Sequence, residues 1–400
     1  MSRLDVLTKA RQWLHPHVAE GDWAYVRRPE RLQWHSAVQP LRGGGEAFPA
    51  MLAAIAQAKQ RVHLETYILR DDAVGRAFAA ALGERAQAGV TVRLLVDAVG
   101  CLGLASSFLD SLRQQGVQVC EFHPVAPWRP RHGLNTRDHK KILVVDDCVG
   151  FIGGLNLGAE YEDITKGGGG WYDWHAQVEG PVVQSLSTAF AATWLRAGGS
   201  SYPLPAQAPT RSESSRLPSV LGAKVIVNEG VRERFGMHLS YLHAIRAARH
   251  EIAIMNAYFI PTRGLRRALA QAVRRGVRVR IVVPGQSDVA AVAHAARFQY
   301  TRLLKSGVEL HRWPGMMHAK FAVIDGIWTT IGSYNLDRRS IEHNLEAGLV
   351  VLDRPLGERV HAQFETDVQL CTPVSLEELA ARSWWERSKD AFWHSLRYWL

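Results

Sequence analysis

The sequence repeats one short pattern of reactive residues. Residues 139–146 (HKKILVVD) and 318–325 (HAKFAVID) both read H-x-K-x-x-x-x-D. A small-residue turn and an asparagine follow each copy, GGLN at 153–156 and GSYN at 332–335, and the asparagine comes 17 residues after the histidine in both. Two copies in matched frames are not expected by chance, so the pattern indicates one site built from two related halves.

Each copy supplies groups that transfer of a phosphoryl group requires. A neutral imidazole can attack phosphorus and form a phosphohistidine, while a second, protonated imidazole gives its proton to the leaving oxygen. Ammonium and amide groups stabilise the charge on the other phosphate oxygens. We therefore expect catalytic roles for His139, Lys141, Asn156, His318, Lys320 and Asn335. This chemistry requires no cofactor, and we expect no metal because no His, Cys or Asp cluster has ligand spacing.

The elements around the two motifs indicate an internal duplication. Each half has a strand pattern, a helical pattern that ends at a glycine and a second apolar strand, at 62–68, 74–88 and 92–96 in the first half and 252–258, 264–275 and 277–283 in the second. Such βαβ units predict the α/β class. We expect two duplicated domains, each a mixed, mostly parallel sheet flanked by helices. A pseudo-two-fold axis would relate them, with the active site between them.

We expect each motif to lie on a strand, so that its histidine and lysine point to the same face. Asp325 and Gly326 predict a hairpin, whose returning strand at 328–331 brings Asn335 back beside the histidine. Asp146 and Asp325 are each an odd number of positions after their histidine, so on a strand their side chains point to the opposite face. We expect them to support local structure around the site rather than contact phosphate.

Composition divides the chain further. Residues 200–219 are rich in Pro, Ser and Ala without periodicity, which is typical of a linker. The expected organisation is an amphipathic or irregular segment at 1–40, domains at 41–199 and 220–370 on either side of the linker, and an aromatic, basic tail at 371–400.

The bulk composition is that of a globular protein, with 47% hydrophobic and 22% charged residues. A net charge of +10 favours anionic partners, either nucleic acid or an anionic membrane face. The 4 cysteines form no C-x-x-C pair, which indicates a reducing compartment. No apolar run reaches the length of a membrane span, so we expect a protein that does not cross a membrane but is able to lie on one.

The paired motif resembles that of the phospholipase D superfamily, and the chain is similar within it to bacterial cardiolipin synthases, especially the form without N-terminal transmembrane helices. The resemblance extends over residues 41–369. The segments that carry it are 64–67 (LETY), Asp97, 136–141 (TRDHKK), 153–156, 171–173 (WYD), 318–320 (HAK), 332–340 (GSYNLDRRS) and 344–346 (NLE).

The resemblance implies roles for individual residues. A carboxylate in each half would orient that half's histidine, and the matching positions are Asp173 and Glu346. A surface acid at the start of a strand is the alternative for both. His139 would be the nucleophile and His318 the general acid. Ser333 would support the second half alone, because the first copy has a glycine in its place.

Four features favour a lipid substrate. Trp313, Met316 and Met317 form an apolar approach to the second motif, Trp128 and Arg129 precede the first, and both chain ends mix aromatic or apolar residues with bases. Core packing or a dimer contact would explain the same residues. Tyr67, in the matching segment 64–67, is a further candidate for substrate contact.

The resemblance implies a phosphatidyltransferase of the cardiolipin synthase type, with phosphatidylglycerol as donor and acceptor. Alternatives are a phospholipase D that uses water and yields phosphatidic acid, a nuclease or other phosphodiesterase, and a scaffold with a relic site. We expect a peripheral protein on the cytoplasmic side of the cell membrane, bound to its anionic surface and not to nucleic acid. The oligomeric state is left open.

Overall fold

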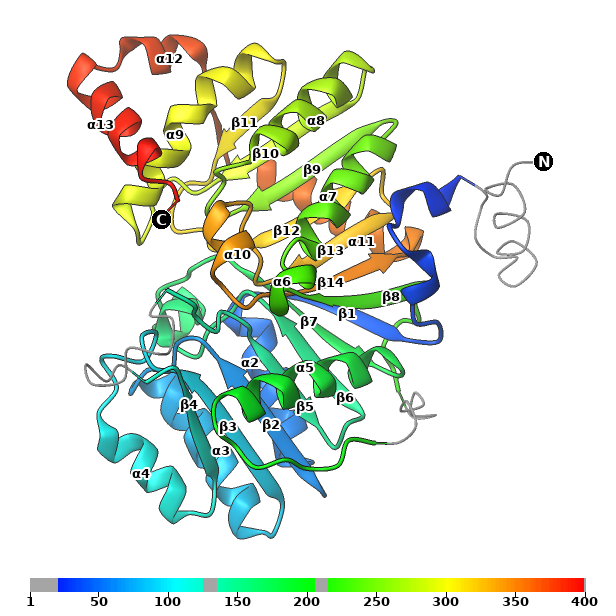
Figure 1. Cartoon of the computed structure of the whole chain (residues 1–400), viewed down its shortest axis with the longest axis vertical. Coiled ribbons are helices and arrows are strands. Elements are labelled where there is room, and N and C mark those ends of the chain that lie inside the picture. Colours follow the sequence, from blue (N-terminus) through cyan, green and yellow to red (C-terminus); the bar gives the residue numbers. More distant parts are fainter. Residues whose placement is uncertain (1–20, 125–134, 206–214, 399–400) are drawn as a thin grey trace.

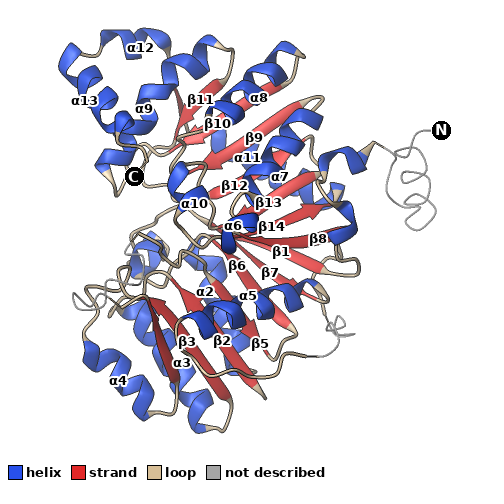
Figure 2. Ribbon diagram, in the orientation of Figure 1, coloured by secondary structure: helices blue, strands red, loops and turns tan. Residues whose placement is uncertain are grey.

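Two sheets with helices on their faces form the chain (Figures 1 and 2). The computed structural model describes residues 21–124, 135–205 and 215–398. The first sheet, in the order β1-β7-β6-β5-β2-β3-β4, contains β1 (Ala37–Arg42), β2 (Arg61–Thr66), β3 (Thr91–Asp97), β4 (Gln118–Phe122), β5 (Ile142–Val145), β6 (Val149–Gly153) and β7 (Trp174–Glu179). Its helices are α2 (Gly43–Ala56), α3 (Ala73–Gln87), α4 (Ser106–Gln114) and α5 (Val182–Arg196).

The second sheet has the order β15-β11-β10-β9-β12-β13-β14-β8. Its strands are β8 (Gly222–Val227), β9 (Glu251–Asn256), β10 (Arg278–Val283), β11 (Glu309–Arg312), β12 (Lys320–Ile324), β13 (Trp328–Gly332), β14 (Ala347–Leu352) and β15 (Thr372–Pro373). The helices of this half are α6 (Gly230–Glu233), α7 (Gly236–Ala247), α8 (Arg263–Arg274), α9 (Ala290–Lys305), α10 (Arg338–Glu342), α11 (Arg354–Gln369), α12 (Leu376–Ala381) and α13 (Trp384–Ser395). Short 3₁₀ turns are η1 (Asp22–Tyr25), η2 (Pro29–Arg31), η3 (Ala159–Tyr161) and η4 (Ile164–Lys166).

The duplication is visible strand by strand. The run β2-α3-β3-α4-β4-β5-β6-β7 of the first half corresponds to β9-α8-β10-α9-β11-β12-β13-β14 of the second, and the order of strands in the sheets matches. Gly89 and Gly276 follow α3 and α8 with φ of 86° each, the left-handed conformation that ends a helix. The α/β class and the duplicated, mixed sheets are confirmed.

The sheets contain fewer parallel pairs than we expected. Among the described strands, β2, β3 and β4 pair in parallel, as do β9, β10 and β11, and the other pairs are antiparallel. The reason is local. Each motif strand turns back at its aspartate into a hairpin, which adds an antiparallel meander beside the βαβ unit.

One apolar core joins the two halves. Ile142, Ile152 and Trp174 from the first sheet pack with Phe321 and Leu349 from the second in a single buried cluster. Because this shared core fixes the halves against each other, segments from both can meet at one site.

The N-terminal segment packs against the second half although it precedes the first. Trp23 and Tyr25 lie in the core of the second sheet with Met237. Gln33 and Ala223 exchange two backbone hydrogen bonds, of 2.7 and 3.1 Å. We propose that residues 21–36 belong structurally to the second half. Residues 1–20 of the predicted N-terminal segment and residues 206–214 of the predicted linker lie outside the described residues.

The C-terminal helix α13 has one packed face and one exposed face. Its buried His394 stacks on Phe298 of α9, with ring centroids 4.5 Å apart. Trp384, Trp385 and Phe392 are 57%, 63% and 58% exposed. Along the described residues, the structure contains no helix with the length and apolar character needed to cross a membrane.

Candidate active site

The two histidines stand just outside the sheets, where the halves meet. β5 begins at Ile142 and β12 at Lys320, so the expectation that the whole motif lies on a strand is wrong at its N-terminal end. Instead, the backbone N–H of His139 donates to Leu345 in the second half at 2.9 Å, and that of His318 donates to Tyr172 in the first half at 2.7 Å. The histidine that begins each motif thus lies outside its own sheet and forms a backbone hydrogen bond with the other half.

The orienting carboxylates cross in the same way. Nδ1 of His139 lies 3.0 Å from Oε2 of Glu346, and Nδ1 of His318 lies 2.8 Å from Oδ2 of Asp173. The expectation that each carboxylate serves the histidine of its own half is therefore wrong. The backbone pairing explains this, because Tyr172 and Leu345 immediately precede the two carboxylates in sequence. A hydrogen on Nδ1 shared with the carboxylate leaves Nε2 as the reactive nitrogen.

Both histidines line one cavity of about 550 Å³. Their ring centroids are 6.5 Å apart and their planes lie at 73°. Asn156, Asn335 and Tyr67 line the same cavity, and the Tyr67 ring meets His139 edge-on at 5.0 Å. This separation leaves room for a phosphorus atom between the two imidazoles.

The two lysines lie beneath the histidines of their own motifs. Nζ of Lys141 donates to the carbonyl of His139 at 2.7 Å and lies 5.3 Å from the centre of the Tyr67 ring. Nζ of Lys320 donates to the carbonyl of His318 and lies 2.8 Å from its Nδ1. Both ammonium groups are buried.

Burial and neighbouring cations shift both imidazoles toward the neutral form. Burial lowers the pKa of His139 well below its ordinary value, and the charges of Lys141 and Lys320 lower it further. Burial also lowers the pKa of His318, but Asp173 opposes that shift through its hydrogen bond and its charge. The main influences on His139 all lower its pKa, whereas Asp173 opposes the lowering at His318.

Lys141 and Glu346 titrate near neutrality. Burial lowers the pKa of Lys141 to about 7, with the charge of Glu346 opposing the shift. Burial raises the pKa of Glu346 to about 7, with the charge of Lys141 and hydrogen bonds opposing it. A phosphate in the cavity would favour the protonated, charged form of Lys141.

The two carboxylates have different surroundings. Glu346 accepts hydrogen bonds from Ser333 and, at 2.8 Å, from Ser340. Asp173 accepts the backbone N–H of Trp174 at 2.7 Å, and a Cβ on Gly154 would stand 2.3 Å from its Oδ1. The two motifs differ here for a structural reason. Ser333 donates its hydroxyl to Glu346, whereas Gly154, at the matching position, leaves space for the Asp173 carboxylate.

Asp146 and Asp325 lie at the opposite ends of their strands from the histidines. The Asp146 carboxylate accepts the backbone N–H groups of residues 59–61 at 2.8 Å each. Asp325 accepts those of residues 249–251 at 2.6–2.9 Å. Neither lines the histidine cavity. These contacts close the turns before β2 and β9.

The apolar residues before the second motif pack away from the cavity. Trp313 stacks on Tyr172 with ring centroids 4.4 Å apart, and the Met316 carbonyl accepts the Tyr172 N–H at 3.1 Å. Met317 is buried in the core between the sheets. The described lining of the histidine cavity includes none of these three residues. Trp128 and Arg129 lie outside the described residues.

Several cavity residues were not singled out from the sequence. The Tyr161 hydroxyl accepts from Asn156 Nδ2 at 2.8 Å and lies 3.3 Å from Nδ1 of His318. On the same side, the Tyr258 hydroxyl donates to Asp288 at 2.7 Å. Because the second motif has no repeat of Tyr161, the duplication could not reveal it. Arg137 and Arg339, which also line the cavity, lie in segments that matched the family.

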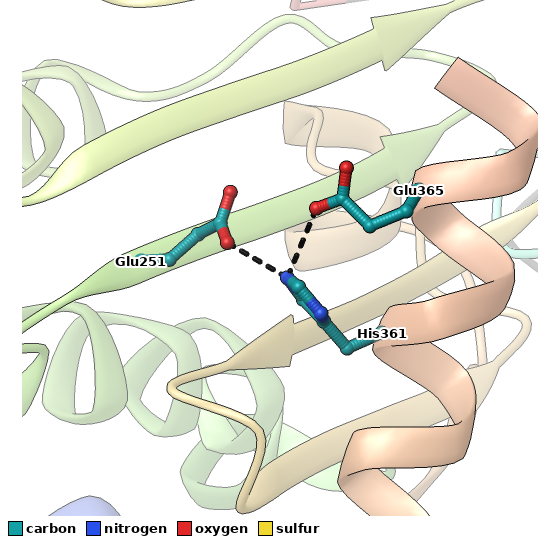
Figure 3. Close-up of side chains that lie close together, drawn as sticks. All are labelled: Glu251, His361 and Glu365. Atoms are coloured by element: carbon teal, nitrogen blue, oxygen red, sulfur yellow. Dashed lines mark hydrogen bonds and ion pairs between the residues drawn. The ribbon is translucent and has the colours of Figure 1, made fainter. Parts of the chain in front are cut away.

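A different cluster of two carboxylates and an imidazole lies away from the cavity (Figure 3). Glu251 on β9 faces His361 and Glu365 on α11, and His361 Nε2 lies 2.7 Å from Glu251 and 3.3 Å from Glu365. Such groups could hold a cation, but Arg280 already forms ion pairs with both carboxylates. We interpret the cluster as an ion network that ties α11 to the sheet.

Two duplicated α/β halves that bring paired H-x-K motifs into one cavity define a phospholipase D-like site. A family model described as "Cardiolipin synthase, PLD-like domain" matches residues 51–164 and 241–368. Cardiolipin synthase B of Salmonella typhi is 35% identical over 90% of this chain and 88% of its own length. A probable cardiolipin synthase of Bacillus subtilis (strain 168) is 32% identical over 89% of this chain and 71% of its own.

A phosphatidylserine synthase of Haemophilus influenzae Rd KW20 has the same fold, with a TM-score of 0.70 over 98% of this chain and 100% of its own at 16% identity. The chain belongs to the cardiolipin synthase family of phospholipase D-like enzymes. The family resemblance and the expectation of an enzyme of this type are thus confirmed.

Proposed function

We propose that this protein transfers a phosphatidyl group from one phosphatidylglycerol molecule to the headgroup of another, which yields cardiolipin and glycerol. The observation that carries the proposal is the crossed pair of histidines. Two imidazoles face one cavity, and each is oriented through Nδ1 by a carboxylate of the opposite half. Membership of the cardiolipin synthase family supports the lipid substrate.

The first half-reaction forms a phosphohistidine. Nε2 of His139 attacks phosphorus and the bond from phosphorus to the glycerol oxygen breaks, while protonated His318 gives its proton to that oxygen. Lys141 and Lys320 stabilise the charge on the phosphate oxygens, and Asn156 and Asn335 add amide hydrogen bonds. The charge and hydrogen bond of Asp173, which oppose the lowering of the pKa of His318, support the role of His318 as the general acid.

The second half-reaction reverses the first with a new alcohol. His318, now neutral, takes the proton of the acceptor hydroxyl, whose oxygen attacks phosphorus and displaces His139. If water takes the place of the acceptor, the product is phosphatidic acid. Exclusion of water by the acceptor lipid therefore decides between transfer and hydrolysis.

We propose that the enzyme works at an anionic membrane surface on the cytoplasmic side. The exposed aromatic face of α13, formed by Trp384, Trp385 and Phe392, suits a lipid headgroup layer. Helix α9, on which α13 packs, begins next to Asp288 and Val289 of the cavity lining. The same helix pair thus links the aromatic face to the active site.

A lipid assay tests the proposed function. The purified protein is incubated with phosphatidylglycerol liposomes and EDTA, and the lipids are analysed by mass spectrometry beside His139→Ala. We expect cardiolipin and glycerol from the native protein alone. Phosphatidic acid as the sole product would make the protein a hydrolase. No lipid product, together with cleavage of DNA, would contradict the proposal and favour a nuclease.

A further inference from the structure

A second cavity, of about 530 Å³, lies between the N-terminal segment and the second sheet. Its lining residues come from the N-terminal segment, drawn in blue in Figure 1, and from β8, α6 and α7. Its lining and that of the histidine cavity share no residue. The charged side chains that line it are the cations Arg27, Arg28, Arg31 and Lys224 and the carboxylate Glu233.

Backbone contacts hold these cations in place. The two hydrogen bonds between Gln33 and Ala223 fix the N-terminal segment along β8. Arg28, with φ of 58°, turns the chain at the entrance to η2. The Lys224 ammonium donates to the carbonyl of Arg27, which ties the segment to the strand from below. The folded backbone therefore determines where the cationic cluster of Arg27, Arg28, Arg31 and Lys224 lies.

Among the described residues, the lining of the cavity has four cationic side chains and one carboxylate. Within the described residues, no carboxylate lies at ion-pair distance from the guanidinium groups of Arg27, Arg28 or Arg31. Lys224 is only 6% exposed, and burial lowers its pKa to about 8, with Glu30 opposing the shift. The arginines lower it further. Like charges gathered at one cavity repel each other unless an anion joins them.

The cavity also has an apolar side. Ile226 and Leu239 line it, and Leu239 is 37% exposed. Phe235, next to the cavity residue Gly236, is exposed as well. The volume lies within the range of about 300–1,000 Å³ typical of small-molecule sites. A ligand that suits all these features combines a negative group with an apolar part.

We propose that this cavity binds the phosphate headgroup of an anionic phospholipid, as a second lipid site separate from the histidine pair. Guanidinium groups recognise phosphate oxygens through paired hydrogen bonds, and a buried ammonium adds a point charge. The apolar side accommodates the start of an acyl chain. Free phosphate shares the headgroup chemistry, and the experiment below separates the two sources.

Binding measurements test the second site without turnover. All proteins carry His139→Ala, and calorimetry follows the binding of dihexanoyl phosphatidylglycerol below its micelle concentration, and of inorganic phosphate, at low salt. We expect two lipid sites in this background. R28Q/R31Q should weaken one of them at least about tenfold, because two charge-assisted contacts are lost, and should leave the other unchanged. Both substituted side chains are exposed, so the fold is retained.

The matched control removes two arginine charges at a site outside both cavities. Arg263 and Arg267 are exposed on α8 and line neither cavity, so R263Q/R267Q should retain both lipid sites. If R28Q/R31Q also retains both with affinities within about twofold, the proposal is wrong. Loss of phosphate binding in R28Q/R31Q with lipid binding unaffected would assign the cavity to free phosphate and overturn the lipid site.

Proton uptake provides an independent readout. The charged groups near Lys224 are Glu30, Glu233, His243 and the three arginines of the cluster. A bound phosphate adds negative charge and raises the pKa of Lys224, so binding near pH 8 takes up protons. The binding heat should then vary with the ionisation heat of the buffer, and in R28Q/R31Q this dependence should fall to the part that Lys141 contributes in the histidine cavity. An equal dependence in both proteins would contradict the assignment.

Discussion

Glu346 and Asp173 each act on a histidine that lies in the other half of the chain. Neither half alone contains an oriented imidazole, so the chemistry depends on how the halves dock as well as on the motifs. The two imidazoles also differ electrostatically, because Asp173 opposes the lowering of the pKa of His318, whereas the main influences on His139 all lower its pKa. At the scale of single residues, the two halves of the site contain the same types of group, but the pKa shifts of their two histidines have different causes.

If Lys141 stabilises the bound phosphate as proposed, phosphate binding should depend on pH. Its pKa of about 7 in the empty site means that it carries its charge below pH 7 and loses it above. The affinity for a short-chain phosphonate analogue of the lipid, which is not turned over, should fall about fivefold between pH 7 and pH 8. In K141R the charge persists, so the fall should be absent. The same fall in K141R would assign it to another group.

The Ser333 and Gly154 positions should respond unequally to exchange. S333G removes one hydrogen bond to Glu346 and should lower kcat about 3- to 30-fold. G154S places a Cβ 2.3 Å from Asp173, so it should displace that carboxylate and lower kcat by more than about 100-fold. Steady-state kinetics on phosphatidylglycerol would measure both. Equal losses would mean that the two carboxylates are equally constrained.

At the scale of elements, the turns that close β2 and β9 depend on the motif aspartates. Asp325 accepts three backbone N–H groups and the hydroxyl of Tyr25, at 2.5 Å. D325A should lower the free energy of unfolding by about 2–3 kcal/mol, and D325N by less, because one acceptor oxygen remains. Urea denaturation followed by circular dichroism tests this. An unchanged midpoint with lost activity would instead place Asp325 in the chemistry.

Some features of these elements could be predicted from sequence patterns, and others could not. The H-x-K motifs and their asparagines were found because the duplication repeats them in matched frames. Asp173 and Glu346 were predicted as orienting carboxylates from the family resemblance, but their crossing was not, since sequence spacing does not reveal which half a loop docks against. Tyr161 lacks a repeated counterpart and gave no signal. The sheets are less parallel than predicted because the hairpins at Asp146 and Asp325 add antiparallel strands beyond the βαβ unit.

At the scale of the whole molecule, helix α13 has an exposed aromatic face that we propose to contact lipid. W384A/W385A should weaken binding to phosphatidylglycerol vesicles at least about tenfold in a sedimentation assay, because two exposed indoles are lost. L195A/L370A, which removes two exposed leucines elsewhere, is the matched control and should bind like the native protein. Unchanged binding of W384A/W385A would show that this face does not contact the membrane.

The two proposed lipid-binding features are consistent with a net charge of +10 that favours anionic surfaces. The aromatic face of α13 lies on the helix pair next to the active site, whereas the cationic cavity lies along β8 and the N-terminal segment. Residues 21–36 thus form part of a proposed ligand site as well as of the second core.

Trapping the covalent intermediate tests the two-histidine mechanism most directly. Phosphatidyl-p-nitrophenol has a leaving group that needs no protonation, so His318→Ala should still allow attack by His139 but not the second half-reaction. We expect a burst of about one equivalent of nitrophenolate and a phosphatidyl adduct on His139 by peptide mass spectrometry. His139→Ala should give neither. A burst in His139→Ala, with the adduct on His318, would contradict the assigned roles.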